Sequence, residues 1–192
     1  MADVFEDRRD LDGEREKLWE LIGETRGLDW LLLTKRPDLV HQLTPWGDSW
    51  PDNVWIGTTA ENQEWADQRL PALARIPAKV RFISAEPLLG PIKLGQWSQY
   101  IHWVITGGES GANARPSSPS WFRPLLNECV AADIPFHFKQ WGDWAPGQGS
   151  NLAKARYAAA DDGTTMLRIG KKAAVRLLGG EQWNGLPKLD HA

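Results

Sequence analysis

Two cations and two polar side chains follow the first two apolar runs of the sequence. Lys35 and Arg36 stand directly after the first run, and Glu61 and Asn62 stand shortly after the second. Ammonium and guanidinium groups bind carboxylates and phosphates. A solvated loop is the alternative for the two cations, and a helix N-cap is the alternative for Asn62. We therefore treat all four residues as candidates for ligand binding, with the two cations as candidates for holding an anionic group.

A third apolar run leads into Ser84 and Glu86, and a proline follows at once. A carboxylate beside a buried strand needs a partner, because burying an unpaired charge is costly. The partner of Glu86 is either a ligand or a nearby arginine such as Arg81. Ser84 and Glu86 are therefore candidates for the site, and Glu86 is also a candidate catalytic group.

The segment GGESG, which follows the fourth apolar run, has the most distinctive composition. Gly107 and Gly108 allow the backbone to approach a ligand closely or to adopt positive φ, although a tight turn would also use them. Glu109 and Ser110 add a carboxylate and a hydroxyl, and Arg115 adds a cation in the same loop. The segment is neither a P-loop nor a Gly-x-Gly-x-x-Gly motif. We expect these residues to contribute to the same site.

A fifth apolar run ends at Lys139, Gln140 and Trp141, which offer a cation, an amide and an aromatic face. Trp141 and Trp144 are candidates for stacking on a base. Further on, Gly170, Lys171 and Lys172 precede a predicted helix and resemble an anion-binding arrangement, although paired exposed lysines are common. Together these residues predict a site for a small anionic or nucleotide-like ligand.

The overall composition argues against several other classes of function. The chain has 192 residues, a formal net charge of −3 and one cysteine, Cys129. One thiol forms no cysteine-rich metal site, and the histidines show no metal-ligand spacing, so we expect no metal site. The net charge does not favour nucleic acid as a partner, although a local basic patch could bind it. Because we find neither a membrane span nor a signal peptide, we expect a cytoplasmic protein.

The apolar runs predict strands that are covered on both faces. They begin at residues 29, 54, 80, 102 and 135. One helical pattern, at 13–25, precedes them, and others lie between them at 38–43, 62–76 and 119–132. This alternation is typical of parallel strands joined by right-handed crossovers. We therefore predict the α/β class, as a partial (β/α) barrel of about five to six parallel strands with a site at the strand ends.

A single domain over 1–192 is predicted, in three consecutive parts. An N-terminal helical segment covers 1–28, and the β/α units cover 29–144. The rest, 145–192, is a C-terminal excursion that is rich in glycine and polar residues. Within it we predict a loop or small hairpin at 145–165, a strand at 166–169 and a short helix at 173–178.

Six segments together resemble the phage-associated three-cysteine-motif proteins, a family of unknown biochemical function. They are LLTKRP (32–37), VWIG (54–57), SAEPLLG (84–90), GGESG (107–111), FKQWG (138–142) and GKKA (170–173). The resemblance covers residues 1–187 and implies a barrel like that of radical S-adenosylmethionine enzymes. It also implies an N-terminal segment with three closely spaced cysteines, and a separate partner protein named for that motif. Three cysteines are not present here, so we expect S-adenosylmethionine and an iron–sulfur cluster only if such a segment is supplied.

Three hypotheses remain open. The first is a truncated or variant form of such a barrel, which binds an anionic ligand at its rim and performs no radical chemistry. The second is a non-catalytic phage module that binds a protein or nucleic acid through a tryptophan-rich face, since the sequence contains 12 tryptophans. The third is a metal-independent lyase or hydrolase that uses Glu86 and Glu109 as acid and base.

Overall fold

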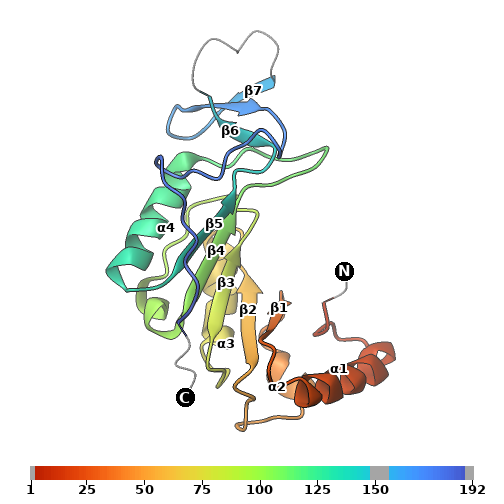
Figure 1. Ribbon diagram of the computed structural model, residues 1–192. Helices are drawn as coiled ribbons and strands as arrows, with labels where there is room; N and C mark the ends of the chain where they lie inside the picture. The colour runs from red at the N-terminus through yellow and green to blue at the C-terminus, as the bar shows by residue number, and fades with distance from the viewer. Residues whose placement is uncertain (1–2, 148–155, 189–192) are drawn as a thin grey trace.

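Five parallel strands form the main sheet of the protein, in the sequential order β1-β2-β3-β4-β5 (Figure 1). The computed structural model describes residues 3–147 and 156–188. The strands are β1 (Trp30–Thr34), β2 (Val54–Thr59), β3 (Arg81–Ala85), β4 (Trp103–Gly107) and β5 (Phe136–Gln140). The predicted α/β class and the series of parallel strands are therefore confirmed.

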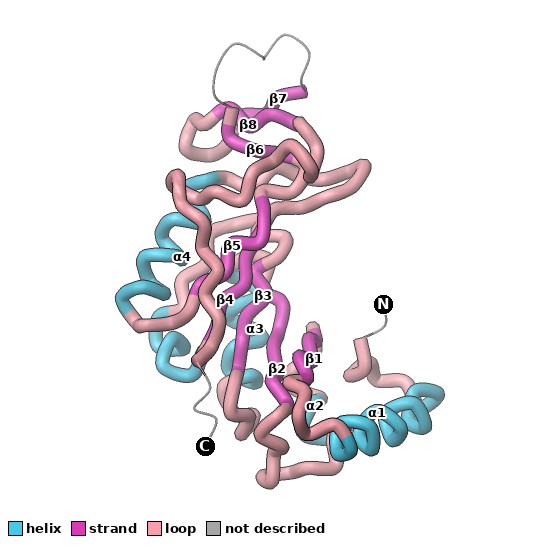
Figure 2. Tube along the Cα trace, viewed as in Figure 1, coloured by secondary structure: helices cyan, strands magenta, loops and turns pink. Residues whose placement is uncertain are grey.

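The helices contribute buried side chains to the main apolar core, and all except α1 lie between strands of the main sheet in the chain. They are α1 (Asp12–Glu24), α2 (Val40–Leu43), α3 (Gln63–Leu73) and α4 (Pro119–Ala131), with short 3-10 turns η1 (Arg9–Leu11) and η2 (Gly95–Tyr100). Figure 2 shows α3 and α4 on the same side of the strands. A sequential strand order with right-handed crossovers places every connection on one side, as in a β/α barrel. None of the helices described here is long and apolar enough to cross a membrane.

The sheet separates two apolar clusters, because side chains alternate along each strand. Ile56 and Ile83 belong to the main core, which also contains the buried side chains of α3 and α4. Trp55, Phe82 and Trp103 form a smaller cluster on the opposite face. All six residues of β2 are buried, which explains why that strand appears in the sequence as a continuous apolar run.

A small antiparallel sheet follows β5, with strand order β6-β8-β7. Its strands are β6 (Trp144–Pro146), β7 (Arg156–Ala159) and β8 (Thr165–Arg168). β7 lies in the region where a loop or small hairpin was predicted, and it pairs with β8, which confirms the predicted strand. Residues 148–155 of the predicted excursion lie outside the described residues.

The short helix predicted at 173–178 is wrong, because the structure has a turn and bends there, followed by an isolated bridge at Leu178. The carbonyl of Leu177 accepts a hydrogen bond from the indole of Trp141, and that of Leu178 accepts one from the indole of Trp183. Six residues are too few to form a stable helix without help from packing. Tertiary hydrogen bonds therefore determine the backbone here in place of local propensity.

The C-terminal segment runs alongside β5 (Figure 1). Phe138 donates its backbone N–H to the carbonyl of Trp183 at 2.9 Å, and Gly185 donates to the carbonyl of Phe136 at 2.9 Å. A Cβ at Gly185 would lie 2.6 Å from the nitrogen of Phe136. This segment therefore covers the edge of β5, while β1 forms the other edge of the sheet.

Candidate functional site

The last residues of neighbouring strands lie side by side at one rim of the sheet. The parallel register pairs Thr34 with Thr58, and Ala85 with Thr106. The Thr58 hydroxyl donates to the carbonyl of Thr34 at 2.8 Å, and the Thr106 hydroxyl donates to that of Ala85 at 2.9 Å. Ser84, a predicted site residue, is buried at the end of β3. The residues that follow the strands are therefore held along a common rim.

Glu61 is neutralised by two cations at this rim. Lys35 Nζ lies 2.9 Å from Glu61 Oε1, and Arg69 Nη1 lies 3.0 Å from Oε2. Burial raises the pKa of the Glu61 carboxyl, but the hydrogen bond from Lys35 and the charges of Lys35 and Arg69 outweigh it, so the pKa lies below its usual value. The Asn62 side chain accepts a hydrogen bond from the backbone of Trp65 at 3.1 Å and caps α3. Asn62 therefore has the N-cap role that was its alternative.

Arg36 contacts the N-terminal segment. Its Nη1 atom lies 3.6 Å from Asp3 Oδ2 and 3.8 Å from Glu6 Oε1. Asp3 also accepts hydrogen bonds from the Thr34 hydroxyl at 2.9 Å and from the backbone of Lys35 at 3.0 Å. The charge of Arg36 therefore holds the N-terminal segment against the end of β1.

The side chain of Glu86 contacts two residues of β5. Lys139 Nζ lies 2.9 Å from Glu86 Oε2, and the Gln140 amide nitrogen lies 3.4 Å from Oε1. Arg81, the alternative partner suggested by the sequence, donates instead to backbone carbonyls, including that of Tyr100 at 2.8 Å. Three predicted site residues from two strands are therefore brought together.

Glu109 is paired within its own loop. Its two carboxylate oxygens accept hydrogen bonds from Nε and Nη2 of Arg115 at 2.8 Å, and the backbone of Arg115 adds another at 2.8 Å. The Arg115 side chain lowers the pKa of the Glu109 carboxyl. Ser110 is exposed beside it. A carboxyl held ionised in this way is a poor general acid near neutral pH, which does not favour the hypothesis of paired glutamates.

The glycine pair after β4 packs against the chain that follows β5. Gly108 donates its backbone N–H to the carbonyl of Gln140 at 2.8 Å. A Cβ at Gly108 would lie 2.0 Å from the carbonyl oxygen of Trp141, and one at Gly107 would lie 3.1 Å from that of Gln140. We expected these glycines to admit a ligand. In the structure they admit a neighbouring stretch of backbone.

Trp141 does not present a face for stacking, contrary to the sequence-based expectation. Its ring is buried and packs edge-on against Phe122 and Phe138, with ring centroids 5.0 and 5.1 Å away. Its indole N–H donates to the carbonyl of Leu177 at 2.9 Å. Trp144 is buried as well. Both residues are therefore part of the core.

Most of the tryptophans are buried or half-buried. Trp65 is the one tryptophan within 3–147 and 156–188 that counts as exposed, with 37% of its surface accessible. The Arg69 guanidinium lies 4.2 Å from the centre of its ring. The tryptophan-rich binding face of the second hypothesis stays a prediction.

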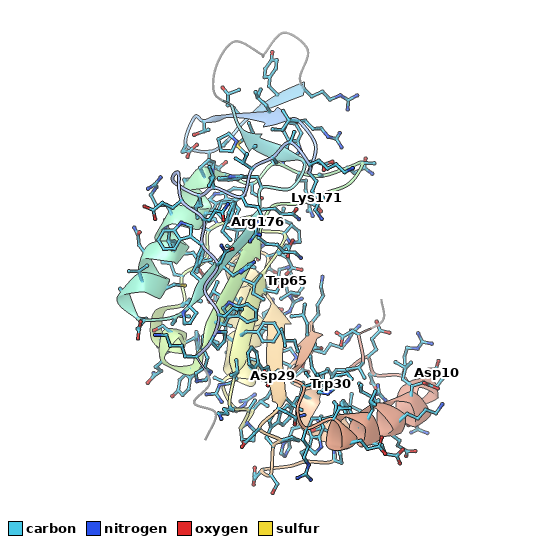
Figure 3. The ribbon with its side chains drawn as sticks, in the orientation of Figure 1. Asp10, Asp29, Trp30, Trp65, Lys171 and Arg176 are labelled. Atoms are coloured by element: carbon cyan, nitrogen blue, oxygen red, sulfur yellow. The ribbon has the colours of Figure 1, made fainter. Side chains whose placement is uncertain are left out.

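One cavity at the rim combines several cations, and we call it the basic cavity. It has a volume of about 770 Å³ and lies beside the end of β5. It is lined by Lys139, Gln140, Lys171, Lys172, Ala174, Val175, Arg176, Leu177 and Gln182. No acidic residue is among them. Figure 3 shows Lys171 and Arg176 near the end of the sheet where β5 ends.

The cations of the basic cavity differ in how they are paired. Lys139 is held by Glu86, whereas Lys171, Lys172 and Arg176 have no ion pair among the described residues. Arg176 donates to the Asn184 side chain at 2.8 Å and lies 3.4 Å from His137 Nε2. Burial, followed by the charges of Arg176 and Lys139, lowers the pKa of His137. The ring is therefore neutral at neutral pH and adds no charge.

Sequence reasoning identified this cavity only in part. Lys139 and Gln140 were predicted site residues, and Lys171 and Lys172 were noted as resembling an anion site. Arg176 was missed, although its spacing from the lysine pair could have drawn attention to it.

The thiol content does not fit an iron–sulfur cluster. Cys129 is the single cysteine of the sequence and is buried in α4. Burial raises the pKa of its thiol to about 12, so it does not supply a thiolate ligand. Within the described residues, no group of three His, Cys, Asp or Glu side chains could hold a metal ion.

Comparison with known proteins gives a family but no activity. A family model described as "Protein of unknown function (DUF5131)" matches residues 1–187, nearly the whole chain. No curated protein and no solved structure matches this chain. Any functional assignment is therefore based on the geometry of the site.

Proposed function

The chain belongs to the DUF5131 family of proteins of unknown function, and we propose that it binds a small anionic, nucleotide-like ligand in the basic cavity. The observation that carries this proposal is a cavity of about 770 Å³ with four cations and no carboxylate in its lining. In α/β folds with parallel strands, ligands bind beyond the carboxyl ends of the strands. The basic cavity occupies that position next to β5.

The other cations of the rim are already neutralised within the protein. Lys35 pairs with Glu61, Arg36 with Asp3 and Glu6, and Arg115 with Glu109. An anion near these cations would have to compete with a carboxylate that is already in place. At the basic cavity the positive charge is in excess, so an added anion would be attracted without displacing an internal partner.

The remaining lining residues suit a ligand that is larger than an inorganic ion. Gln140 and Gln182 offer amide donors and acceptors. Val175 and Leu177 offer an apolar wall. A charged part held by lysines, with a less polar part on aliphatic side chains, is the usual arrangement of small-molecule sites. A phosphate-bearing nucleotide has both parts.

Isothermal titration calorimetry with pyrophosphate and with ADP would test the proposal. We expect both to bind the wild-type protein at low salt, and added salt to weaken binding. The double variant Lys171→Ala/Lys172→Ala should bind at least about tenfold more weakly, because two charge-assisted contacts are lost. The matched control Lys17→Ala/Lys93→Ala removes the same charge from exposed sites elsewhere and should bind normally. Equal affinity of the two double variants would refute the proposal.

We also propose that these residues perform no radical chemistry by themselves, because one buried thiol cannot replace three cluster ligands. Anaerobic reconstitution followed by iron and sulfide analysis tests this, and a stoichiometric cluster on this chain would contradict it. If no cluster forms on this chain, as we propose, S-adenosylmethionine binding would depend on a separate segment that carries the cluster cysteines. The phage association and the three-cysteine-motif partner protein remain predictions that rest on the resemblance alone.

A further inference from the structure

A second cavity lies between α4 and the turns that follow β8, and we call it the apolar cavity. Its volume is about 850 Å³, within the usual range of about 300–1,000 Å³ for small-molecule sites. Its walls are mostly apolar and include Trp141, Leu167, Ile169 and Leu177. Ile169 and Leu177 expose 42% and 37% of their surface. Apolar side chains are therefore accessible around a hollow that is large enough for a ligand.

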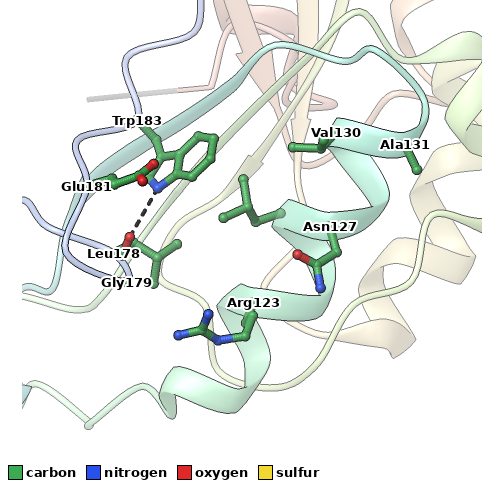
Figure 4. A pocket seen from close by; sticks show the side chains of 9 residues that line it. Arg123, Asn127, Val130, Ala131, Leu178, Gly179, Glu181 and Trp183 are labelled. Atoms are coloured by element: carbon green, nitrogen blue, oxygen red, sulfur yellow. Dashed lines mark hydrogen bonds between the residues drawn. The ribbon is translucent and has the colours of Figure 1, made fainter.

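Arg123 is the one charged residue in the lining of the apolar cavity. It also lines a neighbouring groove of about 550 Å³ that contains Asn127 and Glu181. Figure 4 shows its guanidinium directed from α4 toward Leu178 and Gly179. Within 3–147 and 156–188, Arg123 has no carboxylate within ion-pair distance and no side-chain hydrogen bond. Its charge is therefore not used by the described part of the protein.

The turn opposite Arg123 has no side chains in front of the guanidinium. Gly179 and Gly180 have φ values of +66° and +87°, which favour glycine. A Cβ at Gly179 would lie 3.7 Å from Arg123 Nη2, and one at Gly180 would meet nothing within 4 Å. The space next to the guanidinium is therefore bounded by bare backbone and accessible to a ligand group.

We propose that the apolar cavity binds an apolar monocarboxylate, such as a medium-chain fatty acid, whose carboxylate pairs with Arg123. The planar guanidinium matches a carboxylate with two parallel hydrogen bonds. The apolar walls take up a hydrocarbon body. Glu181 in the adjoining groove disfavours a more highly charged anion. A dianionic phosphate is better served by the basic cavity, so the two sites select different ligands.

Calorimetric titration with decanoate, octanoate and 1-decanol tests each part of this proposal. We expect decanoate to bind about tenfold more tightly than octanoate, because two further methylene groups are buried. In the variant Arg123→Gln, decanoate should bind about tenfold more weakly, because a charge-assisted contact is lost. Decanol should bind Arg123→Gln and the wild type equally. The control Arg26→Gln changes another exposed arginine and should leave all three affinities unchanged.

A second variant tests the apolar wall independently. Ile169→Asp places a carboxylate in the lining at a half-exposed position, so the fold should be retained, as circular dichroism would verify. We expect decanoate binding to be lost there while pyrophosphate binding persists. Decanoate that fails to bind the wild type, or that binds Arg123→Gln as tightly, would overturn the proposal. Neither result would affect the assignment of the basic cavity, because Arg123 and Ile169 do not line it.

Discussion

Replacing Gly108 by alanine should destabilise the protein strongly, because the added methyl group has no room. Its Cβ would lie 2.0 Å from the carbonyl oxygen of Trp141 and 2.6 Å from the carbonyl carbon. These are backbone atoms, so the loops after β4 and β5 would have to separate. Separation would break the hydrogen bonds from Gly108 to Gln140 at 2.8 Å and from Asp143 to Glu109 at 2.9 Å.

These contacts give the size of the expected loss in the free energy of unfolding. Two backbone hydrogen bonds contribute about 1 kcal/mol each, and overpacking adds about 1–3 kcal/mol. We therefore expect Gly108→Ala to lower the free energy of unfolding by about 3–5 kcal/mol, a large part of the stability of a typical domain. Urea denaturation followed by circular dichroism would measure it.

The control variant Gly23→Ala should change the free energy of unfolding in the opposite direction. Gly23 lies in α1, and a Cβ there would meet nothing within 4 Å. Alanine should raise the stability by about 0.5–1 kcal/mol through its helix propensity. If Gly108→Ala unfolded at the same urea concentration as the wild type, the close contact between the two loops would be wrong, and the glycine pair would again be a candidate for contacting a ligand.

Three further predictions concern single side chains. Glu61→Gln should cost about 1.5–3 kcal/mol, because buried Arg69 loses its carboxylate. Since the pKa of Glu61 is lowered on folding, its contribution is present above the usual pKa of a glutamate and is lost as the pH falls through the folded value, so acid titration of stability should show a smaller decline in the variant. Cys129, with its pKa raised to about 12, should react with a thiol reagent only after unfolding; rapid reaction of the native protein would contradict its burial. Trp141→Phe should lower stability by about 1–3 kcal/mol, because it removes the hydrogen bond from the buried indole to the carbonyl of Leu177 and makes a buried ring smaller. Pyrophosphate should bind the folded variant normally, and a loss of affinity would show that Trp141 belongs to the binding site.

Short apolar runs made the main sheet predictable. The predicted strand starts at 29, 54, 80, 102 and 135 differ by at most one residue from those observed at Trp30, Val54, Arg81, Trp103 and Phe136. Both faces of these strands are covered, so their sequences are almost continuously apolar. Where the structure instead depends on contacts between distant residues, as at 173–178, local patterns predicted a helix that does not form.

The rim residues were predictable as a group but not in their partners. The sequence placed Glu61, Glu86 and Lys139 after strands, and the structure pairs Glu86 with Lys139 and Glu61 with Lys35. Pairings across 26 or 53 residues depend on the strand register, which the sequence alone does not give. The roles of Gly108 and Trp141 were missed for the same reason, since both are determined by the contact between the loops after β4 and β5.

Backbone amide chemical shifts test anion binding in the basic cavity most directly. Pyrophosphate titrated into isotope-labelled protein should shift the amide resonances of Gln140, Lys171, Lys172 and Arg176 in a saturable manner. Amides of α1, on the far side of β1, should not move. Shifts confined to the Lys35–Glu61 or Glu109–Arg115 pairs, or no saturable shifts at all, would show that the excess positive charge of the basic cavity does not bind anions.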